Sequence, residues 1–196
     1  MANPFANISF VFLDRDGIVN RKPREGCYIA SWEQFEILPG VEQAIARLNH
    51  SRRTVIVVTN QRGVALGHLT QADLDGIHQR LRDHLAQHGA HLDAIYACPH
   101  NAGQCHCRKP DVGLFEQAFA DFPVARSENS VMIGDSVSDI EAGTRMGMAT
   151  IFIAGDPAHG KPGADRAAHI ATATADSLPD CVDRYLDTVD SATSDS

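Results

Sequence analysis

The sequence predicts an α/β fold in which a Rossmann-like parallel sheet is flanked by helices. Strand-like and helix-like segments alternate along the chain, and the strand-like segments are short apolar runs without polar alternation. Polar residues follow several of these runs directly. With 196 residues the chain is long enough for one domain, which we expect over residues 1–187. Residues 188–196, rich in Ser, Asp and Thr, are expected to be a disordered tail.

The first half of the chain holds two expected strands and two expected helices. An apolar run predicts a buried strand over residues 8–13, and an irregular stretch follows as far as Pro39 and Gly40. Apolar residues at helical spacing predict a helix over residues 41–49, and a second buried strand is expected over residues 54–58. Thr70 is the expected N-cap of a long helix that reaches about Gly89.

The second half continues the alternation. A short strand over residues 95–97 leads into a cysteine-rich loop, and a helix is expected over residues 112–122. A fourth strand over residues 131–133 precedes a helix through Met146 and a strand over residues 149–153. A last strand and helix are expected within residues 169–186. We find no internal repeat and no interdomain linker.

Composition limits the classes of function. The content of 43% hydrophobic and 21% charged residues is ordinary for a globular protein, and the net charge of −8 argues against a nucleic-acid partner. The N-terminal residues show no targeting signal and the apolar runs are strand-sized, so we expect a cytoplasmic monomer without a membrane segment. Most histidines, among them His78, His84, His88 and His91, are expected on the polar surface.

Two aspartates at the end of the first strand carry the clearest chemical signal. Asp14 and Asp16 lie at the sheet edge where open α/β folds bind ligands. Two adjacent anions repel each other, so a cation or a protonated partner must offset the repulsion. Asp-x-Asp-Gly also occurs in ordinary turns and in calcium loops. We interpret the pair as catalytic because the other loops at this edge are also polar.

Three further loops supply complementary groups. Thr59 follows the second strand, Asp135 and Asp139 follow the fourth, and Lys109 lies on the cysteine-rich loop. Because the carboxyl ends of parallel strands share one edge, these loops are expected to converge. Carboxylates of Asp14, Asp16 and Asp135 are hard oxygen ligands suited to Mg²⁺, which also binds substrate phosphate. Lys109 adds a cation that can hold a phosphoryl group.

The cysteine-rich loop predicts a structural zinc site. Three thiolates and one imidazole complete a tetrahedral set within ten residues: Cys98, His100, Cys105 and Cys107. His106 is the competing histidine, and a reduced loop without metal is the alternative. Zinc would order the loop that carries Arg108 and Lys109.

Four motifs in chain order resemble those of the haloacid dehalogenase-like superfamily. They are Asp14-x-Asp16-Gly17, Thr59-Asn60, Lys109 and Gly134-Asp135-x₃-Asp139. The resemblance implies a capless phosphatase in which Asp14 is the nucleophile, Asp16 is the general acid and base, and Thr59 and Lys109 bind the phosphoryl group. It further implies Mg²⁺ held by Asp14, Asp135 and the backbone carbonyl of Asp16. Asp139 is implied as a support for Lys109 or for a metal-bound water.

The zinc loop and the Cys-Arg-Lys-Pro sequence at its end resemble those of two groups in this superfamily. One group hydrolyses heptose bisphosphate and the other hydrolyses histidinol phosphate. The short spacing from His100 to Cys105 favours the second group, whereas residues 26–29 and 59–67 favour the first. The first group implies removal of the 7-phosphate of D-glycero-D-manno-heptose 1,7-bisphosphate, on the way to nucleotide-activated heptose. By that resemblance the substrate contacts come from Arg108 and from Thr59, Asn60, Gln61 and Arg62.

One departure and one alternative remain. Ser136 stands where heptose phosphatases often have lysine, so the anomer preference cannot be transferred from them. A catalytically silent, zinc-stabilised binding module is the alternative from another class of protein.

Overall fold

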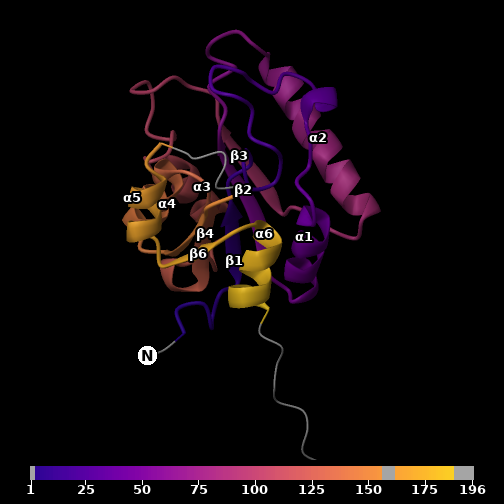
Figure 1. Cartoon of the computed structure of the whole chain (residues 1–196). Coiled ribbons are helices and arrows are strands. Elements are labelled where there is room, and N and C mark those ends of the chain that lie inside the picture. Colours follow the sequence, from indigo (N-terminus) through magenta and orange to yellow (C-terminus); the bar gives the residue numbers. More distant parts are fainter. Residues whose placement is uncertain (1–2, 156–161, 188–196) are drawn as a thin grey trace, which may run out of the picture.

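The computed structural model describes residues 3–155 and 162–187, and at their centre lies one sheet of six parallel strands. The strand order is β3-β2-β1-β4-β5-β6 (Figure 1). The strands are β1 (Phe10–Leu13), β2 (Thr54–Asn60), β3 (Ala94–Cys98), β4 (Ser130–Gly134), β5 (Ala149–Ile153) and β6 (Ala173–Ala175). The predicted parallel sheet is confirmed, whereas the expected tail over residues 188–196 lies outside the described residues.

Helices cover both faces of the sheet, which explains why its strands are apolar on both sides. The helices are α1 (Val41–His50), α2 (Gln71–Gln87), α3 (Gly113–Asp121), α4 (Val137–Arg145), α5 (Ala164–Ile170) and α6 (Leu178–Cys181). One face of β1, with Val11 and Leu13, packs in a core with α1, α2 and α6. The opposite face, with Phe10 and Phe12, packs in a core with α3 and α4.

The expected elements agree with the observed ones except near the C-terminal end. Thr70 caps α2 through a capping box with Asp73, as its position predicts. Helix α5 was not expected, because it has only seven residues and buries only Ala167. It also begins after Gly163 in a left-handed conformation, without a capping side chain that the sequence could have signalled.

The sheet order places a crevice between β1 and β4. Chain connections from these two central strands lead to opposite halves of the sheet, and α/β folds bind ligands at such a switch point. The segment between β1 and α1 holds one short 3₁₀ turn, Trp32–Gln34, so no cap domain is inserted there. Among the described helices, none combines the length and the apolar character needed to cross a membrane.

Candidate active site

Three carboxylates meet at the β1–β4 crevice. One oxygen each from Asp14, Asp135 and Asp139 lies within 4.8 Å of the others, and all three residues are buried. Gly17 makes this approach possible, because its φ is +102° and a Cβ there would lie 2.1 Å from Asp135 Oδ2. The sequence therefore places a glycine where both the backbone conformation and the space require one.

Lys109 is the cation at the centre of this cluster. Its Nζ lies 2.9 Å from Asp14 Oδ1 and 2.6 Å from Asp139 Oδ1, and it donates to the Val58 carbonyl at 2.6 Å. Burial lowers the pKa of Lys109, but Asp139 and Asp14 together raise it above its ordinary value. The ammonium group is therefore charged, and it donates to Asp14 and Val58 while it forms an ion pair with Asp139.

Asn60 fixes the backbone of Lys109. Its side-chain amide donates to the Lys109 carbonyl and accepts from the Lys109 N–H, both at 3.0 Å. Both polar atoms of the Asn60 amide thus position the Lys109 loop, and its expected contact with substrate stays a prediction.

Asp14 lies in an environment that disfavours a bare carboxylate. Burial raises its pKa to about 7, with further increases from Asp139, Asp135 and Asp16, while Lys109 acts in the opposite direction. The cluster therefore has more negative charge than Lys109 offsets, which is the condition under which a divalent cation binds favourably.

Asp16 lies in a different environment, although it is only two residues away. Its carboxylate accepts hydrogen bonds from Arg15, Asn20 and Gln61, each with a shortest distance of 2.9 Å. Burial raises the pKa of Asp16, but Arg15 and these hydrogen bonds lower it below its ordinary value. The Asp16 carboxylate is engaged by these donors and is not part of the group formed by Asp14, Asp135 and Asp139, so its expected metal contact through the backbone carbonyl stays a prediction.

Gln61 links Asp16 to Thr59. Its amide nitrogen donates to Thr59 Oγ1 as well as to Asp16, and its oxygen accepts from Arg15 at 3.1 Å. Gln61 therefore orients these groups, and a direct substrate contact is not needed to explain it. Because the Thr59 oxygen accepts this hydrogen bond, the Thr59 hydroxyl proton remains available to donate.

Sequence reasoning missed the buried support behind Asp16. Arg15 is 1% exposed, donates toward His78 Nε2 at 3.2 Å and lies 5.4 Å from the centre of the Phe35 ring. His78 was expected on the surface but is buried, and burial and Arg15 lower its pKa to about 3. The neutral His78 ring accepts a hydrogen bond from the Arg15 guanidinium, a pairing that arises only when α2 folds against the segment that follows β1.

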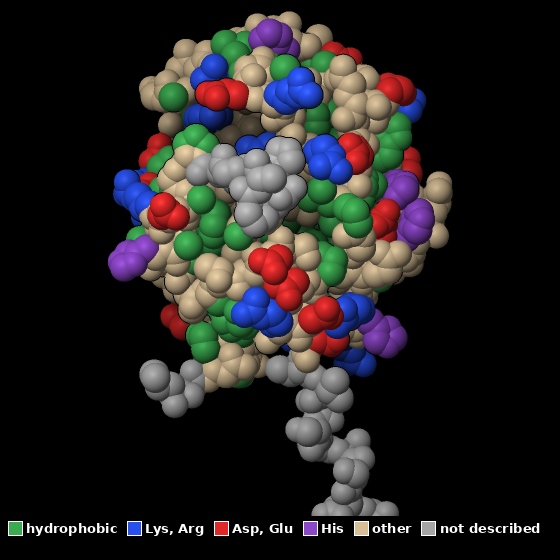
Figure 2. All heavy atoms as spheres, viewed as in Figure 1, with side chains coloured by type: hydrophobic (Ala, Val, Ile, Leu, Met, Phe, Trp, Pro, Cys, Tyr) green, Lys and Arg blue, Asp and Glu red, His purple; other side chains and the backbone are tan. Residues whose placement is uncertain are grey.

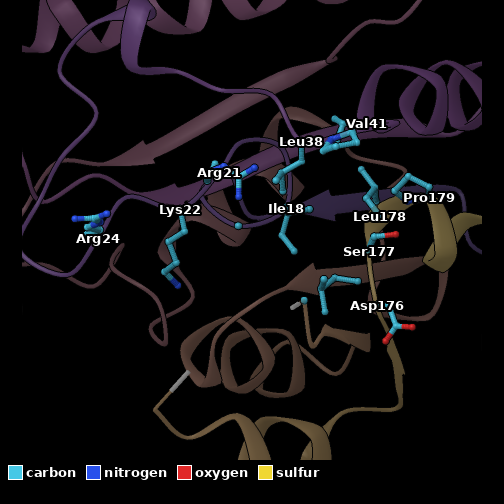
Figure 3. Close-up of a pocket in the computed structure, with 14 residues that line it drawn as sticks. Ile18, Arg21, Lys22, Arg24, Leu38, Val41, Asp176, Ser177, Leu178 and Pro179 are labelled. Carbon is cyan, nitrogen blue, oxygen red and sulfur yellow. The ribbon is translucent and has the colours of Figure 1, made fainter. Parts of the chain in front are cut away.

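Lys22 is a second residue that sequence reasoning missed. Its Nζ lies 3.0 and 3.1 Å from the two oxygens of Asp135, while the side chain is 47% exposed. Lys22 lines a cavity of about 650 Å³ between the segment after β1 and the ends of β5 and β6. Figure 3 shows Lys22 and Arg24 toward one end of this cavity and Asp176 toward the other, and Figure 2 shows Lys and Arg side chains around a hollow. The basic run Arg21, Lys22, Arg24 was the available sequence signal.

The cysteine-rich loop gathers the four expected ligands. Neighbouring ligand atoms of Cys98, His100, Cys105 and Cys107 lie 3.2–3.7 Å apart. A tetrahedral zinc with bonds of about 2.0–2.3 Å separates its ligands by similar distances. His106 instead lies against Gly113, outside the group.

The two expected substrate arginines are placed differently. Arg108 follows the cysteine cluster directly, is partly exposed and donates to the His100 carbonyl at 3.4 Å. Arg62 is exposed at the surface. Both side chains are accessible to solvent, and their expected contacts with substrate stay predictions.

Comparisons with known proteins agree with this geometry. The HAD-hydrolase-like family model matches residues 106–181. The D-glycero-alpha-D-manno-heptose-1,7-bisphosphate 7-phosphatase of Mycobacterium tuberculosis is 38% identical over 86% of this chain and 86% of its own length. The chain belongs to the haloacid dehalogenase-like phosphatases. The resemblance first suggested by the order of the motifs is thereby confirmed.

Two other proteins that are similar to this chain are also named heptose 1,7-bisphosphate phosphatases. The D-glycero-beta-D-manno-heptose-1,7-bisphosphate 7-phosphatase of Vibrio cholerae is 35% identical, over 90% of this chain and 95% of its own. The crystal structure of the D,D-heptose 1,7-bisphosphate phosphatase from B. bronchiseptica, complexed with magnesium and phosphate, superposes with a TM-score of 0.77. It is 30% identical and covers 90% of this chain and 97% of the other.

Proposed function

We propose that the chain is a Mg²⁺-dependent phosphatase that removes the 7-phosphate of D-glycero-D-manno-heptose 1,7-bisphosphate, toward nucleotide-activated heptose. The observation that carries the proposal is the meeting of Asp14, Asp135 and Lys109 at the sheet edge. The names of the similar relatives from three genera support the choice of substrate.

The donor set fits Mg²⁺. Asp14 and Asp135 offer carboxylate oxygens in one buried cluster, and the backbone carbonyl of Asp16 is the proposed third protein ligand. Asp139 is engaged with Lys109 and with the Ser136 N–H at 3.1 Å, so we assign it to positioning Lys109. When bound, Mg²⁺ supplies positive charge that lets the anionic phosphoryl group approach Asp14.

The residues then divide the reaction into two displacements. A carboxylate oxygen of Asp14 attacks phosphorus and the bond from phosphorus to the sugar oxygen breaks, which gives an aspartyl phosphate. Asp16 gives a proton to the leaving alkoxide, then takes one from the water whose oxygen attacks phosphorus and releases Asp14. Because Asp16 is ionised in the free protein, the proton it gives must be taken up when the charged substrate binds.

Lys109 and Thr59 act on different atoms. Lys109 orients Asp14 and stabilises its negative charge, since it donates to Asp14 and to the Val58 carbonyl and forms an ion pair with Asp139. Thr59 has its hydroxyl proton free to donate to a phosphoryl oxygen, where charge is stabilised in the transition state. The four-ligand cysteine cluster is the proposed structural zinc site, which fixes the loop before Arg108 and Lys109.

The test is a comparison of kcat/KM for both anomers of the heptose bisphosphate and for histidinol phosphate, with products followed by ³¹P nuclear magnetic resonance. We expect a heptose bisphosphate to be the best substrate, with the 1-phosphate retained in the product. Both anomers are needed because the relatives are named for different ones. Preference for histidinol phosphate, or loss of the 1-phosphate, would overturn the proposed substrate. Asp14→Asn is the control for contaminating phosphatases.

A further inference from the structure

A group of metal-ligating side chains lies between α1 and α2, on elements that supply neither the carboxylate cluster nor the cysteine loop. Glu42 of α1, His84 of α2 and His88 at the C-cap of α2 each place one ligand atom within 4.8 Å of the others. We propose that these three residues form a site for a divalent transition-metal ion of the Zn²⁺, Ni²⁺ or Cu²⁺ class.

The spacing of the ligand atoms fits such an ion. His84 Nε2 lies 3.1 Å from Glu42 Oε1, and two ligands of a tetrahedral zinc with bonds of about 2.0–2.1 Å are about 3.3 Å apart. His84 and His88 are four residues apart, so they share one face of the helix end. Their rings are stacked with centroids 4.5 Å apart, and the His88 side chain is exposed.

The hydrogen bonds of His88 prepare its ring for a metal. Nδ1 lies 2.9 Å from the His84 carbonyl, which can only accept, so Nδ1 carries the proton. The lone pair therefore lies on Nε2, the nitrogen that faces away from the backbone. A backbone carbonyl that fixes the tautomer in this way is the usual outer partner of a metal-bound histidine.

The surroundings keep the site open to solvent. The side chains of His84 and Glu42 are 30% and 17% exposed, and His88 is exposed. Three protein ligands leave at least one coordination position for water or for a donor from another molecule. Because the ligands come from two helices, a bound ion would link α1 to α2.

Trp32 gives this site a built-in reporter. It is the only tryptophan in the sequence, and its ring centroid lies 6.1 Å from that of His84. The experiment is a Ni²⁺ titration of the full chain, with zinc supplied to the cysteine cluster beforehand and excess Mg²⁺ present. Calorimetry measures affinity and stoichiometry, and Trp32 fluorescence locates the ion. We expect one Ni²⁺ per chain and quenched fluorescence.

Variants decide between this site and other histidines. His84→Ala and His88→Ala should each weaken Ni²⁺ binding by at least about tenfold, the loss that even an outer partner of a metal ligand causes. His91→Ala is the matched control, since His91 is an exposed histidine nearby on the chain that lies outside the group, and it should bind normally. Unchanged binding in both His84→Ala and His88→Ala, or loss in His91→Ala, would overturn the proposal. Circular dichroism verifies folding, and because no activity is measured, the result is independent of the phosphatase assignment.

Discussion

Asp14 and Asp16 are two residues apart, yet their surroundings give them opposite ionisation. Burial among carboxylates raises the pKa of Asp14 to about 7, whereas Arg15 and two amide donors lower that of Asp16. Two carboxyl groups whose pKa values are moved apart by their environment are the usual basis for separate catalytic roles. In the metal-free protein the split runs opposite to the proposed roles, because a nucleophile acts ionised and a general acid acts protonated. The proposed roles therefore require Mg²⁺ to lower the pKa of Asp14 and the charged substrate to raise that of Asp16.

Replacement of Asp16 tests the second of these roles. Asp16→Asn preserves the shape and most hydrogen bonds but removes the proton transfer, so kcat should fall by about 10²- to 10⁴-fold. Steady-state kinetics on the heptose bisphosphate measures the loss. A kcat close to that of the parent protein would show that Asp16 carries no essential proton.

Protons and Mg²⁺ compete for Asp14. Because its pKa in the metal-free protein is raised to about 7, Mg²⁺ must displace a proton below that pH and finds a free carboxylate above it. The apparent Mg²⁺ affinity should therefore fall by about tenfold per pH unit below about pH 7 and level off above it. Calorimetric Mg²⁺ titrations from pH 5 to pH 8, roughly spanning that value, measure the slope. A flat profile would contradict the raised pKa of Asp14.

Lys22 contacts Asp135, the residue before Ser136, and heptose phosphatases often have a lysine at the position of Ser136. We predict that Lys22 supplies the missing cation to substrate from the segment after β1. Lys22→Met should raise KM for the bisphosphate by about tenfold, the loss of one charge-assisted contact, with little change in kcat. It should also strengthen Mg²⁺ binding, because the ammonium no longer competes for Asp135.

Arg24→Met is the matched control for Lys22. Arg24 lines the same cavity and its loss removes the same charge, so a general electrostatic effect would change both variants alike. Equal increases in KM for the two variants would contradict a specific role for Lys22.

At the scale of elements, the cysteine loop connects β3 to α3 and holds Lys109 at its end. We predict that Cys105→Ser releases zinc and loosens Arg108 and Lys109. Elemental analysis should show about one zinc per chain in the parent protein and less in the variant. Activity on the heptose bisphosphate should fall more than activity on a small phosphate ester, which needs fewer loop contacts. Parent protein without zinc would exclude the zinc site. Equal losses of activity on the heptose bisphosphate and on the small ester would exclude a role of the loop in specificity.

The elements that sequence patterns predicted are those with a strong period or a clear cap. The long helix α2 has an apolar stripe and the Thr70 cap, and β1, β2 and β4 are continuous apolar runs. Helix α5 has neither signal, so it could not be anticipated. The predicted strand ends were accurate enough to place Asp14, Thr59 and Asp135 at one edge of the sheet. This placement requires only that the strands are parallel, because their carboxyl ends then share that edge.

Side-chain direction could not be predicted in the same way. The positions of Asn60 and Gln61 near the site were expected, but each amide serves a neighbouring protein group. Arg15 and Lys22 lie beside the motifs in sequence or in space, yet their partners His78 and Asp135 come from distant segments. Such contacts depend on how helix α2 and the segment after β1 fold against the sheet. The spacing of apolar residues in the sequence does not indicate this arrangement.

At the scale of the molecule, the sheet order produces the site. Strands β3, β2, β1 and β4 lie side by side in the sheet, so loops far apart in the sequence bring Asp14, Lys109 and Asp135 together. Lys22 and Lys109 each form ion pairs with carboxylates that come from other loops. A buried cluster of this composition stabilises the fold poorly by itself, because unpaired negative charge is costly to bury. The proposed catalytic role gives a reason for such a cluster, since the chemistry requires the buried carboxylates.

The central claim is that Asp14 becomes phosphorylated, and acid quenching during turnover tests it most directly. Protein mixed with ³²P-labelled heptose bisphosphate and Mg²⁺ should carry a covalent, hydroxylamine-sensitive label on the peptide that contains Asp14. Asp14→Asn should carry no label and show no turnover. Steady turnover without covalent label, or a label on any other residue, would contradict the account.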